Sequence, residues 1–218
     1  MARTLLLDLD GTLVDTVPDL TAALNHLMHA RALPQFTTAQ VARMVGDGVP
    51  VLLARAFAAR NREPDPAAIP DFMADYEANV AAASRLFPGV AAVLADMKGQ
   101  GWHLAVCTNK PERAARTLLA HLGLLPLLAA VGGGDSFPVR KPDPAHLLAT
   151  LARANGQPAG AVMLGDHRND IACTRGTGIP TIFAAWGYGT PEMATGAAAV
   201  AHTIREAAAI AERLRPPP

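Results

Sequence analysis

The sequence predicts an α/β protein: a doubly wound, Rossmann-like parallel sheet with a small helical domain inserted into it. Short apolar runs alternate with helical patterns along most of the chain, which is typical of such a sheet. Residues 16–84 break this alternation and show helical patterns only. A chain of 218 residues, half of them hydrophobic, is long enough for one large core with an insertion of this kind.

Short apolar runs mark the expected buried strands, which lie at 3–7, 102–107, 128–131, 161–164 and 181–184. Helical patterns separate the later runs and cover 89–99, 111–122, 143–155 and 168–177. Pro111 and Pro144 stand where the first turn of a helix tolerates proline. We interpret the alanine runs near 197–201 and 207–209 as helical as well.

The insertion is expected to be a bundle of short helices. Its Ala- and Leu-rich patterns cover 18–32, 38–45, 49–61 and 66–83, and no convincing strand lies among them. Pro34 and the Gly46-Asp47-Gly48 turn separate neighbouring patterns. The predicted division is therefore a helical domain over 16–84 and an α/β core made of 1–15 and 85–218.

The charge balance argues against binding to polyanions. Lys and Arg number 19, as do Asp and Glu, so no basic excess attracts nucleic acid or an anionic membrane surface. Asp8 interrupts the first apolar run too early for a signal-peptide core, and no other run is long enough to span a membrane. Cys107 and Cys173 are expected to be reduced thiols, so we expect a cytoplasmic protein.

Polar residues follow the predicted strands, and ligands of parallel α/β sheets bind at the carboxyl ends of strands. Their gathering at one edge of the sheet predicts the functional site there. In chain order they are Asp8, Asp10, Gly11 and Thr12; Thr108 and Asn109; Arg140 and Lys141; and Asp166 and Asp170.

The carboxylates favour a divalent cation. Asp8 and Asp10 are two residues apart, so in an extended chain their side chains point the same way and repel each other. A divalent cation, a shared proton, or both would relieve this repulsion. With Asp166 they form an oxygen-ligand set that suits Mg²⁺ and leaves room for phosphate oxygens, although oxygen ligands do not distinguish Mg²⁺ from Mn²⁺. Lys141, Thr108 and the amides of the Gly11-Thr12 turn are candidate phosphate ligands.

Other kinds of site fit less well. A lone Asp-x-Asp is usually a turn or helix-cap feature, so the prediction depends on the whole set. The only serines, Ser84 and Ser136, lie outside a Gly-x-Ser-x-Gly motif, which excludes serine hydrolase chemistry. Gly132-Gly133-Gly134 lacks the Lys-Ser/Thr of a P-loop.

These residues resemble the four motifs of the haloacid dehalogenase (HAD) superfamily over essentially the whole chain. The resemblance implies a HAD-type core, with the inserted helices in the place of the family's mobile cap. Within the superfamily, the chain most resembles bacterial phosphoglycolate phosphatases, although His167 stands where they more often carry Ser. The matching segments are Asp8-Leu9-Asp10-Gly11-Thr12, Val45-Gly46-Asp47-Gly48, Thr108-Asn109-Lys110-Pro111, Arg140-Lys141-Pro142, Gly165-Asp166-His167-Arg168-Asn169-Asp170 and Trp186-Gly187-Tyr188-Gly189.

The resemblance also implies roles for the carboxylates. Asp8 would attack phosphorus and form an aspartyl-phosphate, and Asp10 would act as general acid and then general base. Mg²⁺ would be held by the Asp8 carboxylate, the Asp10 backbone carbonyl and Asp166. Asp170 would orient Lys141 or a metal-bound water rather than bind the metal itself.

The remaining implied roles concern phosphate binding and substrate choice. Thr108 and the Asn109 backbone would bind phosphoryl oxygens, and Lys141 would neutralise developing charge. The carboxylate of phosphoglycolate needs a donor from the cap, and the candidates are Arg43 and the backbone of Gly46-Asp47-Gly48.

Together with this resemblance, the sequence predicts a Mg²⁺-dependent phosphomonoester hydrolase whose partner is a small phosphorylated metabolite, 2-phosphoglycolate. The protein is expected to act as a monomer or a homodimer. The alternatives are another small sugar or amino-sugar phosphate, pyrophosphate, or a phosphosugar mutase. The complete set of Asp8, Asp10, Thr108, Lys141 and Asp166 argues against a non-catalytic sensor. Asp10 argues against dehalogenation, which needs no acid at that position.

Overall fold

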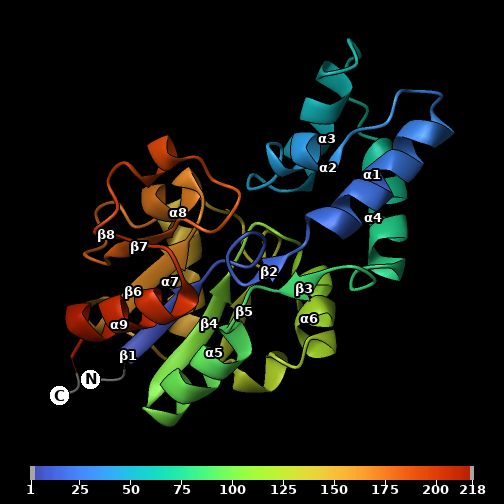
Figure 1. The fold of residues 1–218 in the computed structure, drawn as a ribbon. Helices are drawn as coiled ribbons and strands as arrows, with labels where there is room; N and C mark the ends of the chain where they lie inside the picture. Colours follow the sequence, from blue (N-terminus) through green and yellow to red (C-terminus); the bar gives the residue numbers. More distant parts are fainter. Residues whose placement is uncertain (1–2, 217–218) are drawn as a thin grey trace.

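Six parallel strands form one sheet in the computed structural model, which describes residues 3–216. The order is β5-β4-β1-β6-β7-β8, so the first strand lies inside the sheet and the chain extends it in both directions (Figure 1). The carboxyl ends of β1, β4 and β6 therefore meet at the point where the order reverses, which is where such sheets bind ligands. The strands are β1 (Arg3–Leu7), β4 (Trp102–Cys107), β5 (Ala130–Gly132), β6 (Ala161–Gly165), β7 (Thr181–Ala184) and β8 (Ala199–Ala201).

Helices cover both faces of this sheet. Side chains alternate along β1, so Leu5 and Leu7 belong to one apolar cluster and Leu6 to another. The first cluster includes residues of α5 (Val90–Gly99), α6 (Glu112–His121) and α9 (Ile204–Leu214), and the second includes residues of α7 (Pro144–Arg153). The predicted doubly wound α/β class is confirmed.

Two sequence-based expectations in the last third of the chain were wrong. Residues 199–201 form the edge strand β8, paired with β7, although the alanine run there favoured a helix; residues 207–209 do lie in α9. The helix expected over 168–177 ends early, as α8 (Arg168–Ala172), and turns follow it. Gly176 and Gly178 have φ angles of 75° and 74°, which a continued helix does not allow.

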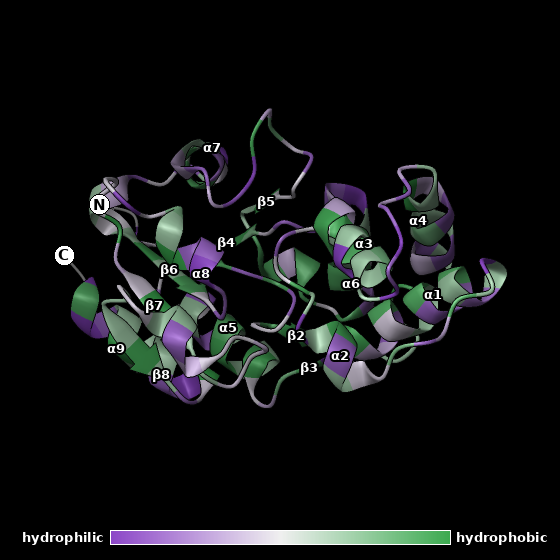
Figure 2. Cartoon of the chain, turned by 90° about the horizontal axis from the view of Figure 1, so that it is seen from above, coloured by the Kyte–Doolittle hydropathy of each residue, from purple (hydrophilic) through white to green (hydrophobic). Residues whose placement is uncertain are grey.

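Four helices form a group of their own beyond the sheet (Figure 1). Figure 2 shows them from above, at one side of the strands, with polar and apolar residues along each. They are α1 (Val17–Ala30), α2 (Thr38–Ala42), α3 (Val49–Ala58) and α4 (Ala68–Ala78). We call α1–α4 and the segments between them the helical group.

A two-stranded sheet joins the helical group to the core. β2 (Val14–Asp15) and β3 (Arg85–Leu86) pair antiparallel where the chain leaves the core and where it returns. Next to them, the buried carboxylate of Asp19 accepts hydrogen bonds from the amides of Ala83 and Ser84 and from the Ser84 hydroxyl, at 2.6–2.8 Å. These contacts hold the two connecting segments together. The predicted domain division at residues 16 and 84 stays a prediction, and the paired strands lie at its edges.

None of the helices in residues 3–216 combines the length and apolar character that crossing a membrane requires.

Candidate active site

Three polar residues stand at the carboxyl ends of three neighbouring strands. Asp8, Thr108 and Asp166 directly follow β1, β4 and β6, and each is at most 5% exposed. The parallel pairing of β4 with β1 and of β1 with β6 sets these residues next to one another. The predicted gathering of polar residues at one edge of the sheet is thus a direct result of strand order.

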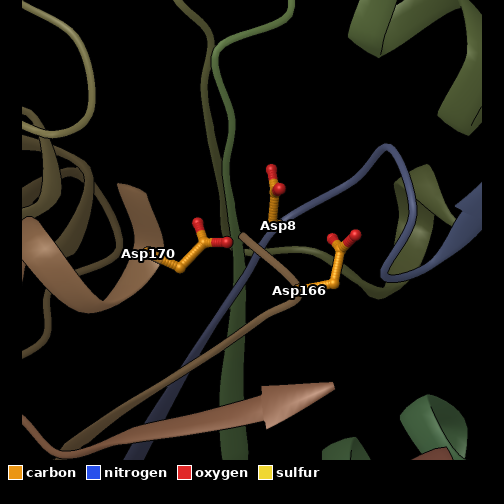
Figure 3. A group of neighbouring side chains, drawn as sticks. All are labelled: Asp8, Asp166 and Asp170. Carbon is orange, nitrogen blue, oxygen red and sulfur yellow. The ribbon is translucent and has the colours of Figure 1, made fainter. Parts of the chain in front are cut away.

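Asp170 joins Asp8 and Asp166 in a cluster of buried carboxylates (Figure 3). Each of the three offers an oxygen atom, and these atoms lie within 4.8 Å of one another. Lys141 Nζ lies 2.9 Å from an Asp8 oxygen and 2.6 Å from an Asp170 oxygen. One buried ammonium group thus contacts two of three buried carboxylates, and the excess negative charge and the all-oxygen donor set fit a divalent cation.

The position of Asp166 is set by its neighbours. Its two oxygens accept hydrogen bonds from the Thr12 hydroxyl and from the Tyr188 amide, both at 2.8 Å. Gly11 has a φ of +85°, and a β-carbon there would lie only 2.4 Å from an Asp166 oxygen. The Gly11 amide, predicted as a candidate phosphate ligand, instead donates to the Val14 carbonyl within the turn. The structure gives Gly11 a steric reason for being glycine.

Burial of the carboxylate cluster shifts its proton affinities. Burial, reinforced by the charges of Asp8 and Asp170, raises the pKa of Asp166 to about 8. Burial also raises the pKa of Asp8 to about 6, although Lys141 opposes the shift. Burial alone would lower the pKa of Lys141, but Asp170 and Asp8 outweigh it and hold the pKa well above its usual value. A cation beside these carboxylates would favour their ionised forms.

We expect the free energy of unfolding, measured in EDTA, to fall as the pH rises from about 5 to 8. The usual pKa of Asp166 is 3.8, so between 3.8 and about 8 the folded protein keeps a proton that the unfolded chain has lost. Stability falls with pH wherever the folded state binds more protons. Asp8 acts in the same direction up to about pH 6. Thermal unfolding at each pH measures the effect, and Mg²⁺ should raise the melting temperature more at pH 8 than at pH 5.

The Asp166→Asn variant is the control for this experiment. It removes the titrating group, so its stability in EDTA should depend less on pH than that of the unchanged protein. A melting temperature that rises from pH 5 to pH 8 in EDTA would contradict the prediction.

Lys110 is a site residue that the sequence analysis did not single out. Its Nζ donates to both carboxylate oxygens of Asp10, at 2.9 and 3.2 Å, and its side chain is only 3% exposed. The available signal was its place directly after Thr108 and Asn109 at the end of a buried strand. Its partner in the helical group is Tyr76, whose ring centroid lies 4.5 Å from Nζ, and nothing in the sequence pattern indicates that contact.

The loop of residues 45–48 rests on the core through two asparagines. Asn109 Nδ2 donates at 3.0 Å to the Gly46 carbonyl and also at 3.0 Å to the Lys141 carbonyl. Asn169 Nδ2 donates at 2.7 Å to Asp47. Because Asn109 bridges the loop and the Lys141 backbone, the helical group and the strand ends are held in contact.

Gly46 allows this contact to be close. Its φ is +121°, and a β-carbon there would lie 2.7 Å from Cδ2 of His167. The His167 ring is buried and accepts a hydrogen bond from the Asn169 amide at the start of α8. Burial lowers the pKa of His167, so the ring is neutral near pH 7.

Replacing Gly46 with alanine should lower kcat/KM by about tenfold, because the new methyl group pushes the loop away from the core and the backbone conformation is strained. Steady-state kinetics measure the loss. His167→Ser removes the ring while keeping a side chain that can cap α8, so the double variant G46A/H167S should recover part of the activity. Equal losses in the single and double variants would show that contact with His167 is not the cause.

A cavity of about 40 Å³ lies between the helical group and the strand ends, and we call it the interface cavity. Its walls include Asp8, Asp10 and Thr108 from the core and Gly46, Leu52 and Tyr76 from the helical group. Arg43 is exposed and lines a neighbouring cavity, which shares Asp10, Val45 and Gly46 with the interface cavity and also includes Asp166. The structure therefore brings Gly46, but not Arg43, to the interface cavity.

Comparison with known proteins places these features in a family. Residues 5–184 match the sequence profile of the haloacid dehalogenase-like hydrolases. The chain is 42% identical over 206 residues to a phosphoglycolate phosphatase of Caulobacter vibrioides, covering 92% of this chain and 87% of that protein. It is 40% identical over 185 residues to a phosphoglycolate phosphatase of Cereibacter sphaeroides, covering 83% and 84%.

A solved structure shows the same architecture. A protein described as a predicted phosphoglycolate phosphatase from Haemophilus somnus superposes with a TM-score of 0.87 at 29% identity. The match covers 95% of this chain and 97% of that one, so it includes both the sheet and the helical group.

Proposed function

The chain belongs to the haloacid dehalogenase-like hydrolase family and is a phosphatase, and from that premise we propose that it hydrolyses 2-phosphoglycolate to glycolate and phosphate. We propose further that it uses Mg²⁺ and an aspartyl-phosphate intermediate. The observation that carries the proposal is the gathering of Asp8, Asp10, Thr108 and Lys141 at one sheet edge, with all but Lys141 on the walls of the interface cavity. Relatives named phosphoglycolate phosphatase support the choice of substrate.

The two carboxylates of the first loop divide the chemistry between them. A carboxylate oxygen of Asp8 forms a bond to phosphorus as the ester P–O bond breaks, and Asp10 gives a proton to the leaving alkoxide. Asp10 then takes a proton from the water that attacks the aspartyl-phosphate, which frees Asp8 and releases phosphate. Proton transfer of this kind is typically worth about 10²–10⁴-fold in rate.

Other residues hold the phosphoryl group. The Thr108 hydroxyl accepts from the Lys110 amide at 3.2 Å, which leaves its hydrogen for a phosphoryl oxygen. The Asn109 backbone and the Lys141 ammonium add further donors. Asp170 accepts from Lys141 at 2.6 Å and from the His167 amide at 2.9 Å, which supports a role in orienting Lys141.

The Asp8 and Asp166 carboxylates and the Asp10 backbone carbonyl would hold Mg²⁺. When bound, the ion supplies the positive charge that lets an anionic carboxylate approach an anionic phosphate ester. The charge excess of the Asp8, Asp166 and Asp170 cluster supports this assignment.

The interface cavity has room for the glycolate part of 2-phosphoglycolate. A water-sized group needs about 10–15 Å³ of such space, so 40 Å³ holds about three of them. A neighbouring cavity of about 240 Å³ shares Asp10, Val45 and Gly46 with it. Free, buried thiols at Cys107 and Cys173 support a cytoplasmic setting, and the choice between monomer and homodimer stays a prediction.

Phosphate release from a panel of esters tests the proposal. We expect kcat/KM for 2-phosphoglycolate to exceed that for sugar phosphates, amino-sugar phosphates and pyrophosphate by at least about tenfold, which corresponds to about 1.4 kcal/mol of transition-state binding. Assays with Mg²⁺, Mn²⁺ and EDTA test the metal. A flat profile would contradict the substrate assignment, isomer formation without phosphate release would indicate a mutase, and full activity in EDTA would contradict the metal assignment.

A further inference from the structure

The interface cavity contains one cationic side chain. Among the described residues that line it, only Lys110 carries a positive charge, while Leu20, Val49 and Leu52 make much of the wall apolar. A charge at the edge of an apolar, partly enclosed space attracts an opposite charge more strongly than the same charge in water. The carboxylates of Asp8 and Asp10 also line the cavity, so Lys110 is the one side chain among the lining residues that can pair with an anionic ligand group.

The Lys110 ammonium has donor capacity left over. It carries three hydrogens, and its two hydrogen bonds go to the oxygens of Asp10 at 2.9 and 3.2 Å. The ring of Tyr76 is its other neighbour, with the ring centroid 4.5 Å from Lys110 Nζ. Because Lys110 is 5% exposed, bulk water has little access to the remaining hydrogen.

Tyr76 supplies a second unused donor. Its hydroxyl is buried beside the Lys110 ammonium, which acts on its pKa, and it donates a hydrogen bond to no residue in the part of the chain that the structure describes. Leaving a buried polar group unpaired costs about 1–3 kcal/mol, so a hydroxyl on a cavity wall in this condition indicates a ligand atom. Burial raises the pKa of Tyr76 to about 12, so the hydroxyl keeps its proton near neutral pH and can donate it.

We propose that Lys110 and Tyr76 together bind the carboxylate of the substrate and thereby select phosphate esters that carry an anionic group next to the ester carbon. This inference rests on the proposed function. In 2-phosphoglycolate the carboxylate carbon lies two bonds, about 2.4 Å, from the ester oxygen. That oxygen must reach Asp10, and Lys110 Nζ is only 2.9 Å from an Asp10 oxygen. A substrate held by Asp10 at its ester oxygen therefore brings its carboxylate to Lys110.

The pairing also connects substrate recognition with closure. Lys110 belongs to the core and Tyr76 to α4 of the helical group, so a carboxylate that binds both joins the two parts over the reacting atoms. A phosphate ester without a carboxylate lacks this connection. Arg43, the cation that the sequence analysis considered for this task, faces the other cavity.

The test is a ratio: kcat/KM for 2-phosphoglycolate divided by kcat/KM for ethyl phosphate, which lacks the carboxylate. Lys110→Met should lower this ratio at least tenfold, and Tyr76→Phe should lower it at least threefold. Tyr76→Phe removes only an unpaired hydroxyl, so it keeps the test valid even if Lys110→Met does not fold. Lys98→Met is the matched control, because Lys98 is exposed and bonds to the Pro126 carbonyl.

Direct binding gives an independent measurement. In the Asp8→Asn background, which prevents turnover, calorimetry should show that adding Lys110→Met weakens binding of 2-phosphoglycolate at least tenfold more than binding of ethyl phosphate. A kcat/KM ratio that stays unchanged in both Lys110→Met and Tyr76→Phe would overturn the inference. A ratio that falls in Arg43→Ala but in neither of those two variants would also overturn it. If the unchanged protein shows no preference for 2-phosphoglycolate over ethyl phosphate, the proposed function itself fails.

Discussion

Replacing Asp8 with asparagine is expected to lower kcat by about 10⁴-fold or more, while the protein folds and still binds phosphate esters. An amide has nearly the shape of a carboxylate but lacks the negative charge and nucleophilicity needed to attack phosphorus. Lys141 keeps its partner Asp170 at 2.6 Å, so it is not left as an unpaired buried charge. Burial disfavours the ionised form of Asp8, so we expect this variant to be no less stable than the unchanged protein in EDTA.

Three measurements check this prediction. Phosphate release gives kcat, calorimetry with 2-phosphoglycolate gives affinity, and thermal unfolding reports on the fold. Asp143→Asn is a matched control, because it makes the same chemical change at an exposed residue that caps α7, and it should keep normal turnover. If Asp8→Asn retained more than a few per cent of the activity, another group would have to be the nucleophile.

The strand ends were predictable because their signal is local. The apolar run of residues 3–7 and the carboxylates that follow it are adjacent in sequence, and parallel pairing brings similar strand ends together. A second apolar run, at 161–164, was enough to predict that Asp166 lies beside Asp8. The structure groups Asp8 and Asp166 at the predicted sheet edge, but the third carboxylate of their cluster is Asp170, whereas the Asp10 carboxylate pairs with Lys110.

Features that depend on distant contacts were not predictable in this way. The strand at residues 199–201 is alanine-rich, and only its pairing with β7 makes it extended. Lys110 gains its place in the site from Asp10, a hundred residues earlier, and from Tyr76 in the helical group. Arg43 was a reasonable candidate from charge alone, but the path of the chain after α2 (Thr38–Ala42) turns it toward another cavity.

The sequence shows where glycines stand in the motifs, but not why glycine is required at those positions. Gly11 and Gly46 both stood in motifs, yet only the structure identifies what each avoids. A β-carbon at Gly11 would collide with Asp166, and one at Gly46 would collide with His167. Both contacts bring a loop close to the residues that follow β6, so these glycines let the first loop and the helical group approach the same carboxylates.

Replacing Asp10 with asparagine should separate the two halves of the reaction. For 2-phosphoglycolate, whose alkoxide needs a proton to leave, kcat should fall by about 10²–10⁴-fold. For p-nitrophenyl phosphate, whose leaving group departs without a proton, formation of the aspartyl-phosphate should remain fast, but water would attack it slowly without a base. The variant should therefore release one equivalent of nitrophenolate per protein in a burst, followed by a slow steady rate.

Rapid-mixing measurement of nitrophenolate distinguishes this outcome from general damage to the site. Asparagine keeps one oxygen to accept a hydrogen bond from Lys110, and it leaves the residue 10 backbone carbonyl in place, so the surroundings change little. Adding Asp8→Asn should abolish the burst, because no carboxylate remains to accept the phosphoryl group. Equal losses for both substrates without a burst would show that Asp10 is not the acid–base group. A burst of one equivalent that needs Asp8 would assign covalent catalysis to Asp8 and proton transfer to Asp10 in a single experiment.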